Sequence, residues 1–169
     1  MNGWTGISLD IQDFSNQWKE RNNLFIQSNC LTEDYNSLLP KHYNSNIIDY
    51  LTLDMEAIGD RYKLLKKILD LNYEFKVITI EHDGYINENF IKDEKLPQRD
   101  LLKSKGYKLL CSDISHPKAP DLFFEDWWVN PKYFSEEELD IWISDKISCD
   151  KIFQKLNINY EIAEESKNR

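Results

Sequence analysis

Two short apolar runs, each ending in acidic residues, constrain the fold of this chain more than any other feature. The first covers residues 47–53 and the second covers residues 77–80. Continuous β-branched and aromatic runs of this length predict strands buried on both faces, as in a parallel sheet covered by helices. The polar residues that follow are Asp54 and Glu56 after the first run, and Glu81, His82 and Asp83 after the second. Because ligands of open α/β sheets bind at the carboxyl ends of the strands, we expect the chemical centre at these two strand ends.

The rest of the chain predicts an alternation of strands and helices. Further strands are expected at residues 6–10, 24–28, 107–113 and 123–129. Helices are expected after Asp13, over residues 32–39 with Pro40 as the stop, along Ile58, Tyr62, Leu65 and Leu69, from Pro97 to Gly106, and from the capping box of Ser135 and Glu138 through Leu139, Trp142, Ile143 and Ile147 toward Phe153. Residues 82–96 lack periodicity and predict a loop that covers the strand ends as a lid.

This order of elements predicts a doubly wound, Rossmann-like α/β sheet. The sheet is expected to be mostly parallel and to end in an antiparallel hairpin with a wide connection. No Pro- or Gly-rich linker divides the chain. We therefore assign residues 1–155 to a single domain and residues 156–169 to a charged tail that frays.

Composition excludes several classes of protein. The formal net charge of −9 over 169 residues disfavours nucleic-acid binding, which needs a basic surface. No apolar run approaches the roughly 20 residues of a membrane span, and the N-terminus lacks the pattern of a signal peptide. The three cysteines, Cys30, Cys111 and Cys149, have no CxxC spacing, which disfavours a zinc site or a disulfide framework. These features predict a cytoplasmic protein that acts on a small molecule.

Five segments in a fixed order suggest a family. They are NGWTGISLDIQ, IDYLTLDMEA, KVITIEHDGY, SKGYKLLCSD and FEDWWVNP. Each segment is a weak signal alone, but together they resemble the FkbM-like family of S-adenosylmethionine-dependent methyltransferases over about residues 3–131.

The resemblance implies a methyltransferase sheet, S-adenosylmethionine as cofactor, and methyl transfer to an oxygen of a small, sugar-like hydroxylated substrate. It also implies roles for particular residues. Asp10 would bind the ribose hydroxyls, the turn from Asn29 to Asp34 would lie beside the adenine, Asp54 would lie beneath the methyl donor, and Glu81 and His82 would face it as catalytic groups.

The chain departs from the family pattern in two ways. Ala57 and Asp83 stand where the family has Gly and Asn. The first strand and its Gly-rich loop are absent, and no GxG occurs anywhere in the sequence. We therefore expect an N-terminally truncated sheet. It would accept a strand from a partner chain or a second copy, or would close by pairing residues 6–10 with residues 47–53.

Other interpretations of the acidic residues remain open. Asp54, Glu81 and His82 have the ligand types of a Mg²⁺ or Mn²⁺ site, which would suit either the methyltransferase or a metal-dependent hydrolase. Alternatively, acids at strand ends only cap the next helix, and the chain is a non-catalytic remnant or one half of a split enzyme. A candidate set for the substrate pocket is Glu125, Asp126, Trp127 and Trp128.

Overall fold

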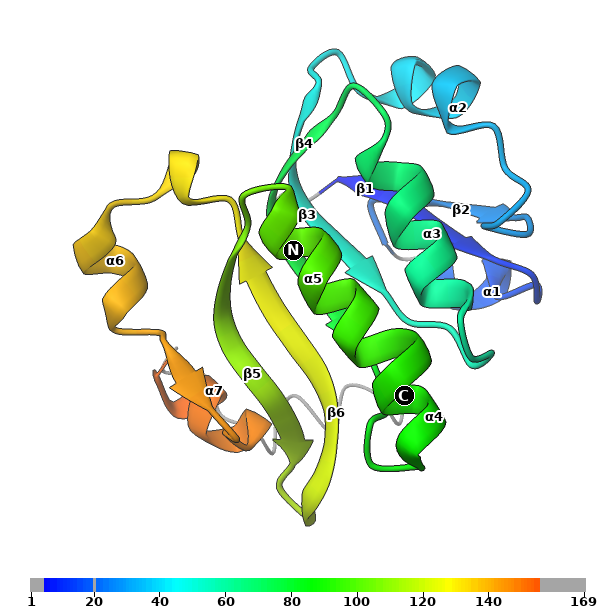
Figure 1. The fold of residues 1–169 in the computed structure, drawn as a ribbon. Helices are drawn as coiled ribbons and strands as arrows, with labels where there is room; N and C mark the ends of the chain where they lie inside the picture. The colour runs from blue at the N-terminus through cyan, green and yellow to red at the C-terminus, as the bar shows by residue number, and fades with distance from the viewer. Residues whose placement is uncertain (1–4, 20, 156–169) are drawn as a thin grey trace.

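The computed structural model, which describes residues 5–19 and 21–155, contains two separate β-sheets (Figure 1). In the smaller sheet, β1 (Gly6–Asp10) pairs in parallel with β2 (Asn23–Gln27). The larger sheet has the strand order β3-β4-β6-β5-β7. Its strands are β3 (Ile47–Leu53), β4 (Glu74–Glu81), β5 (Lys108–His116), β6 (Ala119–Val129) and β7 (Ser144–Asp145).

The larger sheet is mixed. β3 runs parallel to β4, and β7 runs parallel to β5, whereas β6 is antiparallel to both β4 and β5. The expected α/β class and the β5–β6 hairpin are therefore confirmed. The predicted wide connection is wrong, because only Pro117 and Lys118 separate the two strands.

Helices lie between the strands in the expected alternation. They are α1 (Ser15–Trp18), α2 (Tyr35–His42), α3 (Asp60–Leu69), α4 (Glu88–Phe90), the π-helix η1 (Ile91–Lys95), α5 (Leu96–Ser104), the 3₁₀ turn η2 (Pro131–Tyr133), α6 (Glu136–Asp140) and α7 (Cys149–Lys155). Figure 1 shows α3 and α5 over one face of the larger sheet, with α6 and α7 beyond β5. None of the helices in the described part of the chain has the length and apolar character needed to cross a bilayer.

Apolar side chains form two buried clusters. The larger one joins α3 and α5 to the sheet and includes Leu64, Leu65, Ile68, Ile78, Ile80, Leu102 and Trp128. The smaller one joins β5 to the C-terminal helices and includes Leu110, Ile114, Leu139, Ile147 and Ile152. The two clusters cover the sheet from different sides.

The two sheets do not join through β1 and β3. Within the described residues β1 pairs with β2 alone and β3 pairs with β4 alone, so the expected closure of residues 6–10 on residues 47–53 is wrong. Ile7 and Leu9 of β1 nevertheless pack against the apolar cluster that contains Ile48 and Leu53 of β3. The two sheets therefore share a core but not a hydrogen-bond ladder.

Pro40 does not stop α2, which continues to His42. Pro40 is exposed, and its ring removes one N–H donor, while the Tyr43 N–H still bonds to the Leu39 carbonyl at 2.9 Å. The loss of one hydrogen bond on the solvent side is too small to end a helix that Tyr35 and Leu38 anchor in the core.

The predicted lid over residues 82–96 is also wrong, because α4 and η1 occupy most of it and run directly into α5. The buried side chains of the continuous helical segment over residues 88–104 are Phe90, Glu94, Gln98 and Leu102, spaced four residues apart. The π-helical turn shifts the buried face away from a period of 3.6 residues, and two of the four side chains are polar. A search for apolar periodicity cannot find such a helix.

The predicted C-terminal helix is broken into α6 and α7 with β7 between them. The capping box of Ser135 and Glu138 is confirmed. After it, the backbone turns to pair with β5: the Lys146 N–H bonds to the Ser112 carbonyl, and the Ser115 N–H bonds to the Ile147 carbonyl. Ile143 is consequently exposed, and the Phe153 side chain and the tail at residues 156–169 lie outside the described part.

Glycines with positive φ end or begin helices where the backbone requires it. Gly106 has a φ of +85° at the end of α5, which confirms its predicted capping role. At the start of α3 the left-handed residue is Gly59, with a φ of +81°. Because Gly59 supplies this turn, the chain does not need a glycine at Ala57.

Candidate active site

The Asp54 and Glu81 carboxyl groups meet at the ends of adjacent parallel strands. The register pairs Leu53 with Ile80, so the next residue on each strand lies beside the other. Asp54 is exposed, whereas Glu81 is partly buried. This juxtaposition is the one that the two apolar runs predict.

Burial, followed by a hydrogen bond with Asp54 and the charges of Asp54 and Asp83, raises the pKa of Glu81 to about 8, against a smaller lowering by Arg61. Glu81 therefore favours its protonated form near neutral pH and can donate a hydrogen bond to Asp54. A carboxyl group with such a pKa exchanges protons readily under physiological conditions, which is the property that a general acid or base needs.

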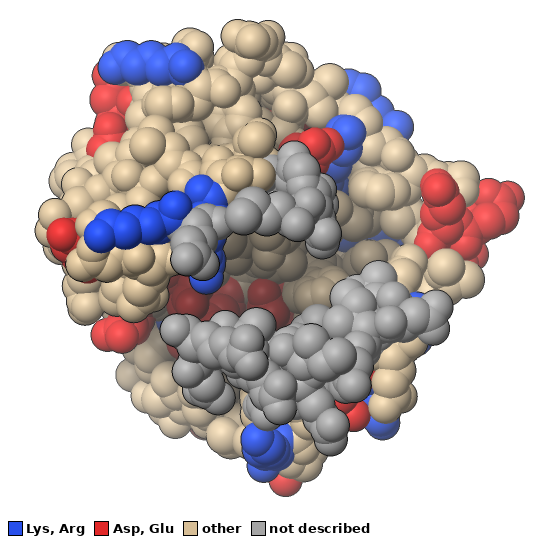
Figure 2. Space-filling view, turned by 180° about the vertical axis from the view of Figure 1, so that it is seen from behind, with Lys and Arg blue, Asp and Glu red and all other residues tan. Residues whose placement is uncertain are grey.

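Glu125 adds a third carboxyl group on the same side of the sheet. It lies directly opposite Glu81 in the antiparallel β4–β6 register, and burial raises its pKa. The charge of Asp54 raises it further. Figure 2 shows acidic side chains on the floor of a hollow on the side of the molecule that faces away from α3 and α5.

Hydroxyl groups continue this polar strip along the strands. The Tyr50 hydroxyl lies 2.8 Å from Thr79 Oγ1, and Thr79 donates to Thr52 Oγ1 at 3.1 Å. Thr52, Thr79 and Trp127 are directly opposite one another across three strands. The sheet surface next to the acids is therefore polar and aromatic.

His82 does not join these acids, which corrects the predicted set of Asp54, Glu81 and His82. His82 is fully buried, and its Nε2 atom lies 3.5 Å from Asp113 Oδ1 and 3.6 Å from Asp126 Oδ1. Its Nδ1 atom accepts the Gly84 N–H at 3.0 Å. Successive strand residues point to opposite faces, so His82 leaves β4 on the other side from Glu81.

Basic side chains neutralise the acids around His82. Arg99 donates to both Asp126 oxygens at 2.7 Å and lies 3.1 Å from Asp113, which also pairs with Lys95. Although burial raises the pKa of Asp126, the hydrogen bonds and the charge of Arg99 lower it well below its usual range. This is a paired buried network.

The network is a poor metal site despite its ligand types. Of the residues that the structure describes, only His82, Asp113 and Asp126 form a group of three with ligand atoms within 4.8 Å of one another. Lys95 and Arg99 already form ion pairs with the two carboxylates, so a metal ion would be repelled by both positive charges. The described residues therefore do not fit a metal here, and the predicted metal set is not assembled.

The residues predicted to hold the cofactor have mainly local partners. Asp10 accepts the Gln12 N–H at 2.8 Å, and Asn29 accepts the Leu31 N–H at 2.9 Å, each within its own turn. Asp34 caps α2 by accepting the Ser37 N–H and hydroxyl. Of the three, Asp10 fits a ribose best, because among the described residues a single donor reaches its carboxylate at the carboxyl end of β1.

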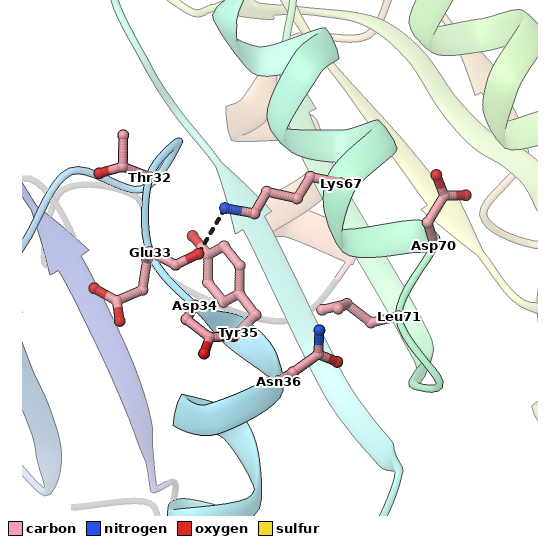
Figure 3. Close-up of a pocket in the computed structure, with 8 residues that line it drawn as sticks. All are labelled: Thr32, Glu33, Asp34, Tyr35, Asn36, Lys67, Asp70 and Leu71. Carbon is pink, nitrogen blue, oxygen red and sulfur yellow. Dashed lines mark hydrogen bonds between the residues drawn. The ribbon is translucent and has the colours of Figure 1, made fainter.

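A surface pocket of about 530 Å³ lies beside Asp34, between the start of α2 and the end of α3 (Figure 3). Lys67 reaches into it and donates to the Leu31 and Glu33 carbonyls at 2.9 and 2.6 Å. Its ammonium group also lies 5.2 Å from the centre of the Tyr35 ring. These bonds tie α3 to the loop after β2, and they leave Lys67 with little capacity for a ligand.

The fold and the acids thus define an open α/β domain with an acidic site at the carboxyl ends of β3 and β4. No family model, no curated protein and no solved structure matches the chain. The geometry of this site and the sequence motifs are therefore the only guides to function.

Proposed function

We propose that this domain is methyltransferase-like, binds S-adenosylmethionine at the carboxyl edge between β1 and β3, and transfers a methyl group to a hydroxyl of a small substrate. The observation that carries the proposal is that Asp54 and Glu81 meet at the carboxyl ends of two adjacent parallel strands, where burial and Asp54 raise the pKa of Glu81. Ligands of doubly wound sheets bind at such a point. The resemblance of the five sequence segments supplies the reaction class.

The residues present fit part of the cofactor. Asp10 suits the ribose, whereas the sequence holds no Gly-rich turn that would support the methionine end. When bound, S-adenosylmethionine would supply an electrophilic methyl group. The chain's own contribution would be a base: once Glu81 has lost its proton, its carboxylate accepts the proton of the substrate hydroxyl as that oxygen becomes nucleophilic.

Calorimetric titration of the chain with S-adenosylmethionine tests cofactor binding. We expect binding that weakens at least tenfold in Asp10→Asn, because the ribose loses a charged acceptor. Asp13→Asn is the matched control: Asp13 lies in the same loop but accepts the Ser15 N–H, and its substitution should leave binding unchanged. Equal affinity in Asp10→Asn and the original chain would contradict the proposed site.

A second candidate is a non-catalytic remnant or one half of a split methyltransferase that needs a further strand. The break in the sheet favours it, because β1 and β3 share a core without pairing, and Ile47 and Tyr50 of β3 are 39% and 44% exposed. An unpaired strand edge of this length commonly pairs with another segment. Another polypeptide segment, from a partner or a second copy, would then fill the break.

Titration in the presence of an added strand-and-glycine segment separates these two candidates. If the chain needs a partner, cofactor binding appears only after the segment is added, and the β3 amides exchange with solvent more slowly. If neither condition gives binding, the methyltransferase proposal fails.

A further inference from the structure

Arg61 is an unusual residue, because a fully buried arginine at the start of a helix needs specific partners. It is 1% exposed and belongs to the first turn of α3. Its Nε donates to the Met55 carbonyl, and its Nη2 lies 2.5 Å from Asp83 Oδ2. Its Nη1 has no hydrogen-bond partner among the described residues.

In the sequence, the two partners of Arg61 lie within two residues of the two acids of the site. Met55 is the residue after Asp54, and Asp83 is two residues after Glu81. Asp83 has a φ of 47°, which a residue with a side chain seldom adopts. Arg61 therefore holds both loops at the points where they leave β3 and β4.

We propose that Arg61 is a positioning residue for the acid pair: by binding the loops after β3 and β4 it fixes the approach of the Asp54 and Glu81 carboxyl groups and places a buried positive charge beside them. This inference rests on the proposed function for its catalytic meaning. Its physical content, the control of the proton on the pair, does not require a cofactor or a substrate.

Charged groups from four elements face Glu81. Asp54 follows β3, Asp83 follows β4, Arg61 lies on α3, and Glu125 lies opposite on β6. The negative charges of Asp54 and Asp83 favour the protonated form, and the charge of Arg61 opposes them. Arg61 and Asp83 also form an ion pair, so a substitution in either one breaks the same contact but changes the local charge in opposite directions.

This opposition provides the test. We expect Arg61→Gln to move the titration midpoint of Glu81 up by about 1 pH unit, because a nearby positive charge is lost, and Asp83→Asn to move it down by a similar amount. The midpoint is measured for the full chain by carbon-13 NMR of the Glu81 side-chain carboxyl group. A purely structural role for the Arg61–Asp83 pair would shift both variants in the same direction, and that result would overturn the proposal.

Two further variants keep the test decisive if Arg61→Gln unfolds. Arg61→Lys retains the charge and should keep the midpoint close to that of the original chain while losing one of the two loop contacts. Arg99→Gln removes another partly buried arginine, one that faces Asp126, and should leave the Glu81 midpoint unchanged. A shift in Arg99→Gln as large as that in Asp83→Asn would contradict a local effect. Opposite shifts without any cofactor binding would refute the methyltransferase proposal and leave this inference intact.

Discussion

Two groups of carboxylates lie on opposite sides of the end of β4, and they differ in what neutralises them. On one side, Asp113 and Asp126 surround His82 and are paired with Lys95 and Arg99. On the other side, Asp54, Glu81 and Glu125 come together, no described Lys or Arg forms an ion pair with them, and burial raises the pKa values of both glutamates.

The difference separates a structural role from a chemical one. The lowered pKa of Asp126 keeps this carboxylate ionised over the physiological range, and removal of its cationic partner would leave a buried charge uncompensated. A carboxyl group with a pKa near 8, such as Glu81, changes charge close to neutral pH and can move a proton. The side chain of His82, the most conspicuous catalytic residue type in the sequence motif, belongs to the first group.

The largest expected effect is on the neutralised side. Arg99→Met should lower the free energy of unfolding by about 3–5 kcal/mol, because it leaves the buried Asp126 charge without its partner. Denaturant unfolding followed by circular dichroism measures this. The double variant Arg99→Met/Asp126→Asn should recover part of the loss. An equal loss in the single and double variants would mean that the charge pair is not the cause.

On the acidic side, the expected effect is on activity. Under the proposed function, Glu81→Gln should reduce methyl transfer about 10²–10⁴-fold, because the base is lost. The unfolding free energy should not fall, since a neutral amide replaces a group that the fold already prefers uncharged. The matched control is Glu88→Gln, an exposed acid in α4. Unchanged transfer in Glu81→Gln would remove this residue from the mechanism.

The two sides should also respond to pH in opposite directions. The folded-state pKa of Glu81, about 8, lies above its usual value of 4.5, so its stabilising contribution is complete below about pH 4.5 and is lost as the pH rises through about 8. The loss should be on the order of 1–3 kcal/mol after solvent screening. The pKa of Asp126 is lowered, so its contribution is present above its usual value of 3.8 and is lost in acid.

Thermal unfolding at a series of pH values measures both losses of stability, the alkaline limb from Glu81 and the acid limb from Asp126. Glu81→Gln should flatten the alkaline limb alone. A variant that flattens the acid limb as well would show that the two groups are coupled through β4.

The smallest expected effect concerns the hydroxyl groups on the acidic face. Tyr50→Phe removes the contact with Thr79 and should cost about 0.5–1.5 kcal/mol of unfolding free energy. The Glu81 midpoint should stay the same, because no charge changes. A clear shift of the midpoint would extend the proton-sharing network along the strand to Tyr50.

Much of the fold could be predicted because it depends on local patterns. The strands at β3 and β4 appear as apolar runs, and their acids meet because parallel strands end at one edge. The failures share a cause in tertiary contacts. β7 forms because the backbone near Lys146 pairs with β5. The helical segment that contains the π-helix was missed because two of its buried residues, Glu94 and Gln98, are polar.

The candidate site was predictable in part for a similar reason. Asp54 and Glu81 follow from strand alternation alone. The position of His82 also follows from alternation, but the sequence motif groups it with Glu81. The burial of Arg61 could not be predicted, because an arginine in a helix is expected to face solvent. Only the structure shows that Met55 and Asp83 are its partners.

We expect Glu81, buried beside Asp54, to keep its proton at neutral pH. Site-resolved carbon-13 NMR of the Glu81 carboxyl group, followed from pH 3 to 10 in the full chain, tests it most directly. We predict a midpoint near 8 that falls in Asp54→Asn. A midpoint near 4.5 that does not respond to Asp54→Asn would contradict the claim.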